Sequence, residues 1–196
     1  MTYSKDFIGI IAVILTIVGF VPYIKSIIIG ETKPHVFSWV IWGITTFIVF
    51  LAQLSDKGGA GAWSIGLSGV ITTFVAFLAY TKKADITISK TDWIFFIFSL
   101  LALPIWYLTS SPFWSVFILT MVDVVGFFPT IRKAYVKPFE EKISLYFIIV
   151  ARNITSILAL EHYSTITLLF PIAITLVILV FIAVVMYRRS LVKPAI

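Results

Sequence analysis

The chain has 196 residues, of which 60% are apolar, 16% are aromatic and only 12% are charged. In a typical soluble domain about a quarter of the residues are charged, roughly twice the share found here. The composition therefore excludes a disordered chain, a nucleic-acid-binding module and almost any soluble enzyme. Such a sequence cannot cover its surface with polar groups, and lipid must do so. We therefore expect an integral membrane protein whose partners are the bilayer and not nucleic acid. With no cysteine, thiolate metal sites and disulfides are also excluded, and no cofactor or metal site is expected.

Seven apolar runs are long enough to cross a bilayer, for which about 17–25 residues suffice. They are Phe7–Ile29, Val36–Leu54, Ala62–Thr81, Trp93–Thr109, Phe113–Ile131, Ile143–Leu160 and Tyr163–Tyr187. Only Glu161 and His162 separate the last two runs, so six spans with one long hairpin remain an alternative. The expected fold is all-α, with seven transmembrane helices.

Basic residues are distributed unequally between the two sets of loops. One side carries twelve of the 15 Lys and Arg residues, the other carries Lys5 and Lys57, and Arg152 lies inside a span. Because basic loops face the cytoplasm, the N-terminus is predicted outside and the C-terminus in the cytoplasm. The short chain and compact loops favour a prokaryotic cytoplasmic membrane.

An internal repeat appears at an offset of 107 residues. The segment Val18–Lys25 (VGFVPYIK) matches Val125–Arg132 (VGFFPTIR), and the same offset pairs Thr46 with Asn153. Duplicated units are indicated by such self-similarity. We predict a first three-helix repeat over residues 1–84, a linker helix over 85–112 and a second repeat over 113–196. One linker helix makes the two copies parallel, an arrangement found in transporters whose site lies between the repeats.

This plan, with a Gly-x-x-Pro in the first helix of each repeat, resembles the PQ-loop superfamily, which includes the SWEET sugar transporters and lysosomal amino-acid exporters. The motif residues are Gly19 and Pro22 in the first repeat and Gly126 and Pro129 in the second. The glutamine of the family's Pro-Gln pair is absent from both copies. The resemblance implies alternating access, with these four residues as hinges. A structural role for the prolines is the alternative, since membrane helices tolerate proline.

Two charged residues lie deep within the predicted spans. Asp123 is about 15 Å from the start of its helix, and Arg152 lies at a similar depth on the next one. Isolated charges there are costly, so we expect Asp123 and Arg152 to form an ion pair or to face a wet cavity. Three roles are open: Asp123 takes and releases a proton that couples transport, the pair binds a zwitterionic or polar substrate, or the pair only fixes the packing.

Aromatic and polar residues recur on one face of the second helix of each repeat. They are Trp39, Trp42, Thr46 and Gln53 in the first repeat, and Tyr146 and Asn153 in the second. A flat apolar face with a few hydrogen-bonding groups suits a sugar or amino acid, so Trp39, Trp42, Thr46, Tyr146 and Asn153 are the predicted substrate-binding residues. The tryptophans could instead belong to the interfacial belt.

The sequence thus predicts a small polar solute transporter that works by alternating access around a midplane cavity, with proton coupling through Asp123 left open. The alternative is a non-transporting receptor or scaffold on the same fold, and a homo-oligomer is also left open. We do not expect an enzyme. The sequence from Gly66 to Gly69 is similar to the Gly-x-Ser-Gly of rhomboid proteases, but no base is predicted to face Ser68.

Overall fold

A computed structural model describes residues 2–32, 34, 36–82, 86, 88, 90–136, 138–140 and 143–192. Inside helices, the side chains of residues 2, 3, 91, 92, 95, 128–130, 132, 133 and 140 are outside this description. Several basic residues used to predict the orientation also fall outside it, namely Lys33, Lys83, Lys137, Lys142 and Lys193 with their backbones, and Arg132 and Lys133 with their side chains.

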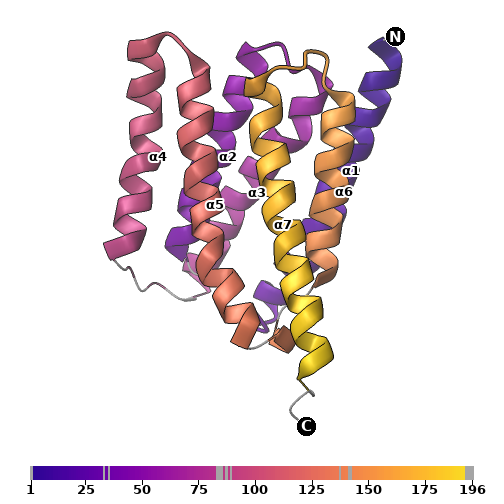
Figure 1. The fold of residues 1–196 in the computed structure, drawn as a ribbon, viewed down its shortest axis with the longest axis vertical. Coiled ribbons are helices and arrows are strands. Elements are labelled where there is room, and N and C mark those ends of the chain that lie inside the picture. The colour runs from indigo at the N-terminus through magenta and orange to yellow at the C-terminus, as the bar shows by residue number, and fades with distance from the viewer. Residues whose placement is uncertain are drawn as a thin grey trace.

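The described residues form seven α-helices and one 3-10 helix (Figure 1). These are α1 (Thr2–Ile28), α2 (Val36–Ser55), α3 (Ala60–Thr81), α4 (Lys90–Thr109), α5 (Pro112–Val136), η1 (Pro138–Glu140), α6 (Ile143–Ala159) and α7 (Thr165–Leu191). Each predicted apolar run coincides with one α-helix. The last two runs form two separate helices, because α6 ends at Ala159 and Ser164 caps the start of α7. The alternative of six spans with one long hairpin stays a prediction.

Four of these helices are long and apolar enough to cross a membrane: Ser4–Ile28, Val36–Ser55, Ala60–Thr81 and Thr165–Leu191. The other three contribute shorter apolar stretches over their described residues, Phe96–Thr109, Pro112–Phe127 and Ile143–Ala159. The all-α prediction is therefore confirmed for the described residues, and four helices have the length and composition needed to cross a membrane.

Apolar side chains cover much of the outside of the bundle, whereas many polar ones lie inside. Phe7, Phe77 and Leu108 are each more than half exposed. By contrast, Asn153 and Gln53 are fully buried. An apolar exterior with polar groups kept inside is what a hydrocarbon solvent requires, because lipid offers no hydrogen bonds to polar groups.

The helices pack in the same order within the first half (α1–α3) and the second half (α5–α7) of the chain. In the first half α3 lies against both α1 and α2, and in the second half α7 lies against both α5 and α6. Between the halves, α1 packs on α6 and α2 packs on α5. In addition, α3 contacts α6, and α7 contacts α2. We call the α1–α6 and α2–α5 contacts the two seams. Helix α4 lies at the edge of the bundle against α5 and α2 (Figure 1).

A hydrophobic core joins α2, α5 and α7. Val49 of α2, Leu119 of α5 and Phe181 of α7 are fully buried members of one cluster. Tyr146 of α6 is packed against the same cluster. This core fixes α7 against both halves of the bundle and thereby positions the two seams.

Small residues allow the closest contact between α3 and α6. A Cβ on Gly61 would lie 2.6 Å from the carbonyl oxygen of Ser156 and 2.7 Å from the nitrogen of Leu160. The Ser156 hydroxyl also donates a hydrogen bond to the Gly61 carbonyl. The contact is backbone against backbone, so no side-chain rearrangement can make room.

We expect Gly61→Ala to destabilise the fold by about 1–3 kcal/mol, because the added methyl group overpacks this contact. Thermal unfolding of the detergent-purified protein measures the effect. Gly126→Ala is the matched control, since a Cβ there meets only Trp42 Nε1, at an ordinary 3.7 Å. Equal stability of the two variants would contradict the packing described for α3 and α6.

Candidate functional site

Asp123 lies inside the seam between α2 and α5. Its side chain is 5% exposed, and the Thr45 hydroxyl is 3.1 Å from Oδ1 and 3.4 Å from Oδ2. Thr45 also lies 3.0 Å from the carbonyl oxygen of Trp42, so its single proton is shared between these acceptors. Asp123 follows Pro112 by eleven residues, or about 16 Å along the helix axis. The carboxylate therefore sits near mid-depth with a single hydroxyl donor.

Arg152 is the second charged residue in the interior, and it lies on the other seam. It is 7% exposed, and its Nη1 is buried without a hydrogen-bond partner. Ile148 and Ser156, one helical turn to either side, contact Gly19 of α1 and Gly61 of α3. Residues four apart share a face of a helix, so Arg152 is directed toward the first half of the chain.

The predicted ion pair between Asp123 and Arg152 is wrong for the described structure, because no ion pair or hydrogen bond joins these two described residues. The prediction assumed that consecutive helices are neighbours. Helix α7 packs against both α5 and α6, which do not pack closely on each other. Each unpaired charge in a membrane interior costs at least about 2.5–3.5 kcal/mol on insertion scales. The arrangement is therefore expensive for a purely structural feature.

The predicted aromatic residues of α2 form a cluster with two rings of α1. Trp39 stacks on Tyr23, with ring centroids 5.0 Å apart, and makes an edge contact with Phe20. The Trp42 ring lies edge-on to Trp39 at 5.6 Å. Trp42 Nε1 approaches Gly126, three residues beyond Asp123. Trp42 thus reaches the α2–α5 seam, whereas Trp39 packs within the first half.

The other predicted binding residues are buried or half-buried but are not gathered around one point. Asn153 is fully buried, donates from Nδ2 to Thr175 of α7 at 3.1 Å, and leaves its Oδ1 without a partner. Tyr146 packs on Phe181 of α7 with ring centroids 4.3 Å apart. Thr46 is buried on α2, beside Thr45. Asn153 and Tyr146 therefore belong to the contact between α6 and α7.

The predicted hinge residues lie in the lower parts of α1 and α5. Pro22 is inside α1, where it removes one backbone hydrogen bond, and its side chain is exposed. Gly19 is buried against Ile148 of α6. Gly126 faces Trp42, and Pro129 lies within α5 with its side chain outside the described residues.

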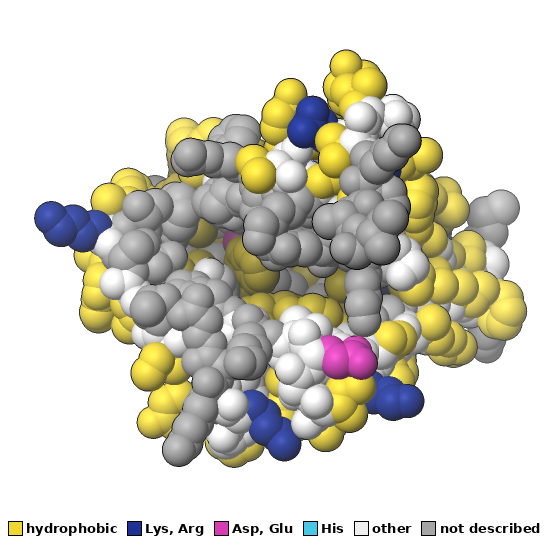
Figure 2. All heavy atoms as spheres, turned by 90° about the horizontal axis from the view of Figure 1, so that it is seen from below, with side chains coloured by type: hydrophobic (Ala, Val, Ile, Leu, Met, Phe, Trp, Pro, Cys, Tyr) yellow, Lys and Arg dark blue, Asp and Glu magenta, His cyan; other side chains and the backbone are white. Residues whose placement is uncertain are grey.

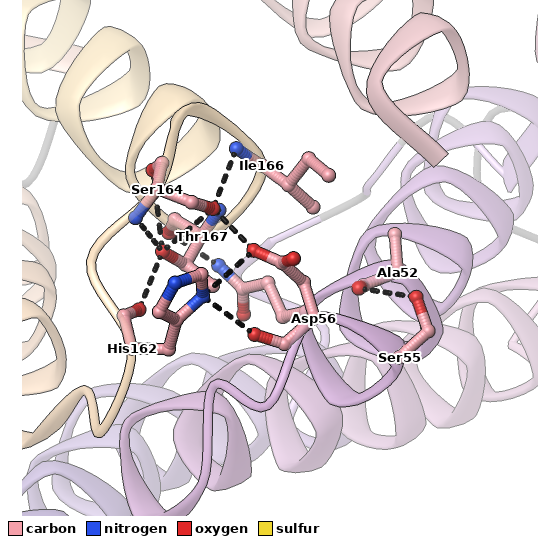
Figure 3. Close-up of polar contacts among 8 residues, drawn as sticks. Ala52, Ser55, Asp56, His162, Ser164, Ile166 and Thr167 are labelled. Carbon is pink, nitrogen blue, oxygen red and sulfur yellow. Dashed lines mark hydrogen bonds and ion pairs between the residues drawn. The ribbon is translucent and has the colours of Figure 1, made fainter. Parts of the chain in front are cut away.

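At the upper end of the bundle in Figure 1, polar contacts join the two halves of the chain, and we call this set the upper latch. Asp56, after α2, accepts a short hydrogen bond from the Ser164 hydroxyl, and His162 Nδ1 lies 3.3 Å from the same carboxylate oxygen. Figure 3 shows these side chains converging from the two loops. Ser164 also accepts from the backbone N–H groups of Ile166 and Thr167 and so caps α7.

Further contacts extend the upper latch on either side. Gln53 Nε2 donates to the carbonyl oxygen of Thr167 at 2.9 Å, and Glu161 N donates to the carbonyl oxygen of Gly58 at 3.2 Å. Lys5 donates to the Leu160 carbonyl oxygen. Every one of these contacts joins the first half of the chain to the second, so the two halves are held together at the upper end.

At the lower end of the bundle, two described hydrogen bonds connect the last turns of α7 with the end of α5 and the segment that follows it. Arg188 and Arg189 at the end of α7 donate to the carbonyl oxygens of Tyr135 and Pro138, so both contacts stay within the second half. Figure 2, which views the molecule from below, shows a recess near the middle of this face in which hydrophobic side chains and an acidic group are visible, while Lys and Arg side chains lie toward the outer edge of the view.

Sequence reasoning missed Thr45 and the upper latch. Thr45 could have been found, because the 107-residue offset pairs it with Arg152, just as it pairs Thr16 with Asp123. Both charged positions thus have a threonine counterpart in the other repeat. The latch had no such signal, since Asp56 and His162 are separated by 106 residues and their loops carry no shared motif.

Among the described residues, no group of three or more His, Cys, Asp or Glu side chains could hold a metal ion. Comparison of the chain with protein-family models, with curated proteins and with solved structures finds no match. What this site does therefore has to be argued from its own geometry.

We expect Ser164→Ala to lower the stability of the fold by about 1–3 kcal/mol, because it removes both a helix cap and a hydrogen bond to a carboxylate. Thermal unfolding in detergent measures the loss. Ser190→Ala is the control, as this exposed hydroxyl bonds only to the Tyr187 carbonyl within its own helix. Unchanged stability in Ser164→Ala would show that the latch contributes nothing to folding.

Proposed function

We propose that the chain is a small polar solute transporter of the PQ-loop type that works by alternating access. It would cross the membrane seven times, as two parallel three-helix repeats joined by α4. The packing order supports this plan when α1, α2 and α3 are taken as the equivalents of α5, α6 and α7. The α1–α3 contact then corresponds to the α5–α7 contact, and α2–α3 corresponds to α6–α7. The two seams, α1–α6 and α2–α5, correspond to each other. A pseudo-two-fold axis between the halves accounts for all of these pairs.

The proposed orientation places the upper end outside and the lower end in the cytoplasm, with the N-terminus outside. Among the described residues, Lys5 and Lys57 belong to the upper end, whereas Lys25, Arg188 and Arg189 belong to the lower end. Basic residues are retained on the cytoplasmic side of a membrane. We further propose a prokaryotic cytoplasmic membrane as the location, on the strength of the compact loops.

The observation that carries the transport proposal is the unequal closure of the two ends around buried polar groups. The upper latch ties the halves together, the lower face is hollowed, and Asp123 and Arg152 lie between these ends in the seams. An alternating-access transporter caught open toward the cytoplasm has this arrangement. Opening the other way requires the upper latch to break and the lower ends of the helices to approach.

The hinge proposal assigns the bending to the Gly-x-x-Pro segments of α1 and α5. Pro22 removes a backbone hydrogen bond at a point where the helix is exposed, so α1 bends there at little cost. Gly126 leaves space beside Trp42 that a side chain would fill. Both segments lie in the lower parts of their helices, where closure of the hollowed end is required.

Linking the upper ends of the halves should stop transport. The chain has no native cysteine, so Asp56→Cys and Ser164→Cys can be joined by a short bifunctional thiol reagent. The solute for the transport assay is a sugar, nucleoside or amino acid that stabilises the protein in a thermal-shift screen. Its counterflow into proteoliposomes should fall to the level of empty liposomes after cross-linking and recover when the link is cleaved. A ligand at 100 times its dissociation constant raises stability by about 2.7 kcal/mol, which makes the screen sensitive.

The two single-cysteine variants treated with the same reagent are the controls for this experiment. Full flux in the cross-linked protein would show that the latch is no gate. Binding without flux in the wild-type protein would overturn the transport proposal and favour a receptor on the same fold.

If transport is proton-coupled, Asp123 is the group that carries the proton, because it is the acidic side chain held in a seam. An inward proton gradient should then drive uptake by the wild-type protein, and Asp123→Asn should abolish this dependence on the gradient. Uptake that ignores the gradient in the wild-type protein would remove proton coupling from the proposal. Ser115→Ala is the control, since its hydroxyl bonds Ala102 of α4, away from the seams.

A further inference from the structure

Three helices enclose the side chain of Arg152. Helix α6 packs on α1 and on α3, and α1 and α3 also pack on each other. We call the region between them the α1–α3–α6 triangle. On α6, Arg152 lies one turn from Ile148, which contacts Gly19 of α1, and one turn from Ser156, which contacts Gly61 of α3. Because residues four apart share a face of a helix, Arg152 is directed between α1 and α3.

Ser64 of α3 is directed into the same triangle. It lies one turn from Ala60, which contacts Gly9 of α1, and one turn from Gly61, which contacts Ser156 of α6. Helix α3 starts at the upper end of the bundle, where α6 ends (Figure 1). One turn below the contact of Gly61 with Ser156, the two antiparallel helices therefore bring Ser64 and Arg152 to one level.

Both of these side chains are buried donors without a partner. Arg152 is 7% exposed and its Nη1 makes no hydrogen bond, and the hydroxyl of the fully buried Ser64 makes none either. A guanidinium can only donate, and a hydroxyl donates wherever it meets an acceptor. The triangle therefore lacks an acceptor at the level of Arg152.

Helix α1 closes the third side of the triangle with small side chains and supplies no charge at this level. Ala12 and Thr16 lie along α1 between its contacts with α3 and α6, and both are buried. The Thr16 hydroxyl donates to the carbonyl oxygen of Ala12 at 2.9 Å. The one acidic residue in the sequences of the three helices is Asp6, about 9 Å above Ala12 along α1.

The missing acceptor has to carry a negative charge. A water molecule accepts hydrogen bonds from both donors, but it leaves the charge of Arg152 uncompensated, which is costly within a membrane. Asp123 lies on the other seam, and no ion pair joins it to Arg152 among the described residues. An anion satisfies both donors and removes the cost of the buried charge.

We propose that the α1–α3–α6 triangle binds one chloride ion between the guanidinium of Arg152 and the hydroxyl of Ser64. Charge-assisted hydrogen bonds from an arginine are among the strong ones in proteins. The side chains around Arg152 are small, which favours a single-atom ion over a branched organic acid. The bound ion joins α3 of the first half to α6 of the second half, and this role is independent of the proposed transport function.

The test measures the unfolding temperature of the purified wild-type protein in detergent. Sodium chloride replaces sodium gluconate at constant ionic strength, so that screening of surface charges does not change. We expect a saturable rise in the unfolding temperature with chloride and also with bromide, because an ion that binds only the folded state stabilises it by mass action. No response to either halide would overturn the proposal, and this series needs no substitution.

Acetate separates an inorganic anion from a small carboxylate as the occupant of the triangle. Both bind a guanidinium, but acetate is larger than chloride and has two acceptor oxygens. We expect acetate to stabilise the protein less than chloride at equal concentration. Stronger stabilisation by acetate would overturn the chloride assignment and indicate a carboxylate ligand in its place.

Variants locate the ion within the protein. Arg152→Gln should raise the apparent dissociation constant for chloride at least about tenfold, because it removes a charged donor. The milder Ser64→Ala should raise it about three- to tenfold, as expected for loss of one hydrogen bond. Arg188→Gln is the matched control, since Arg188 lies over the Tyr135 ring outside the triangle and its loss changes the net charge equally.

The control decides whether a chloride effect belongs to this site. Chloride dependence that is unchanged in Arg188→Gln and weakened in Ser64→Ala and Arg152→Gln would support the proposal. Chloride dependence that survives in both triangle variants, or is lost in Arg188→Gln, would overturn it. If Arg152→Gln does not fold, Ser64→Ala alone decides between these results. The protein is in detergent without any gradient, so none of these outcomes depends on transport.

Discussion

Hydrocarbon offers no hydrogen bonds, and this constraint decides where the polar side chains of the bundle can lie. Asn153 and Gln53 are buried between helices, while the outer surface carries apolar side chains such as Phe7. Each of these amides leaves its side-chain oxygen without a partner, and the two buried charges are also incompletely satisfied: Asp123 has a single hydroxyl donor, and Nη1 of Arg152 has no partner.

The two ends of the bundle differ because they are built from different kinds of contact. The upper end combines tight turns, a helix cap and a carboxylate, so Ser164 both starts α7 and ties it to Asp56 of the first half. The Ser164 side chain therefore both stabilises the start of α7 and holds the two halves together at the upper end. At the lower end, Arg188 and Arg189 make contacts within the second half.

Repetition of the packing order does not extend to the chemistry of the seams. A symmetric scaffold with equivalent side chains would place like charges on both sides of the pseudo-axis, and two buried like charges repel each other. Here the charged residue lies on α5 in one seam and on α6 in the other, with threonines Thr16 and Thr45 at the equivalent positions. The two charges are opposite in sign. The two halves therefore share a packing order but differ in their buried polar side chains.

The sequence by itself determined the all-α class and the apolar runs that form the helices, because hydropathy and helical rise are local properties of the chain. It did not determine which helices touch. The expected pairing of Asp123 with Arg152 was wrong because α7 lies against both α5 and α6, and the upper latch joins Asp56 to Ser164 across more than half of the chain. Such contacts arise only when separate helices pack, since the side chains that meet share no local pattern. Only the tertiary structure could decide that the two buried charges stay apart.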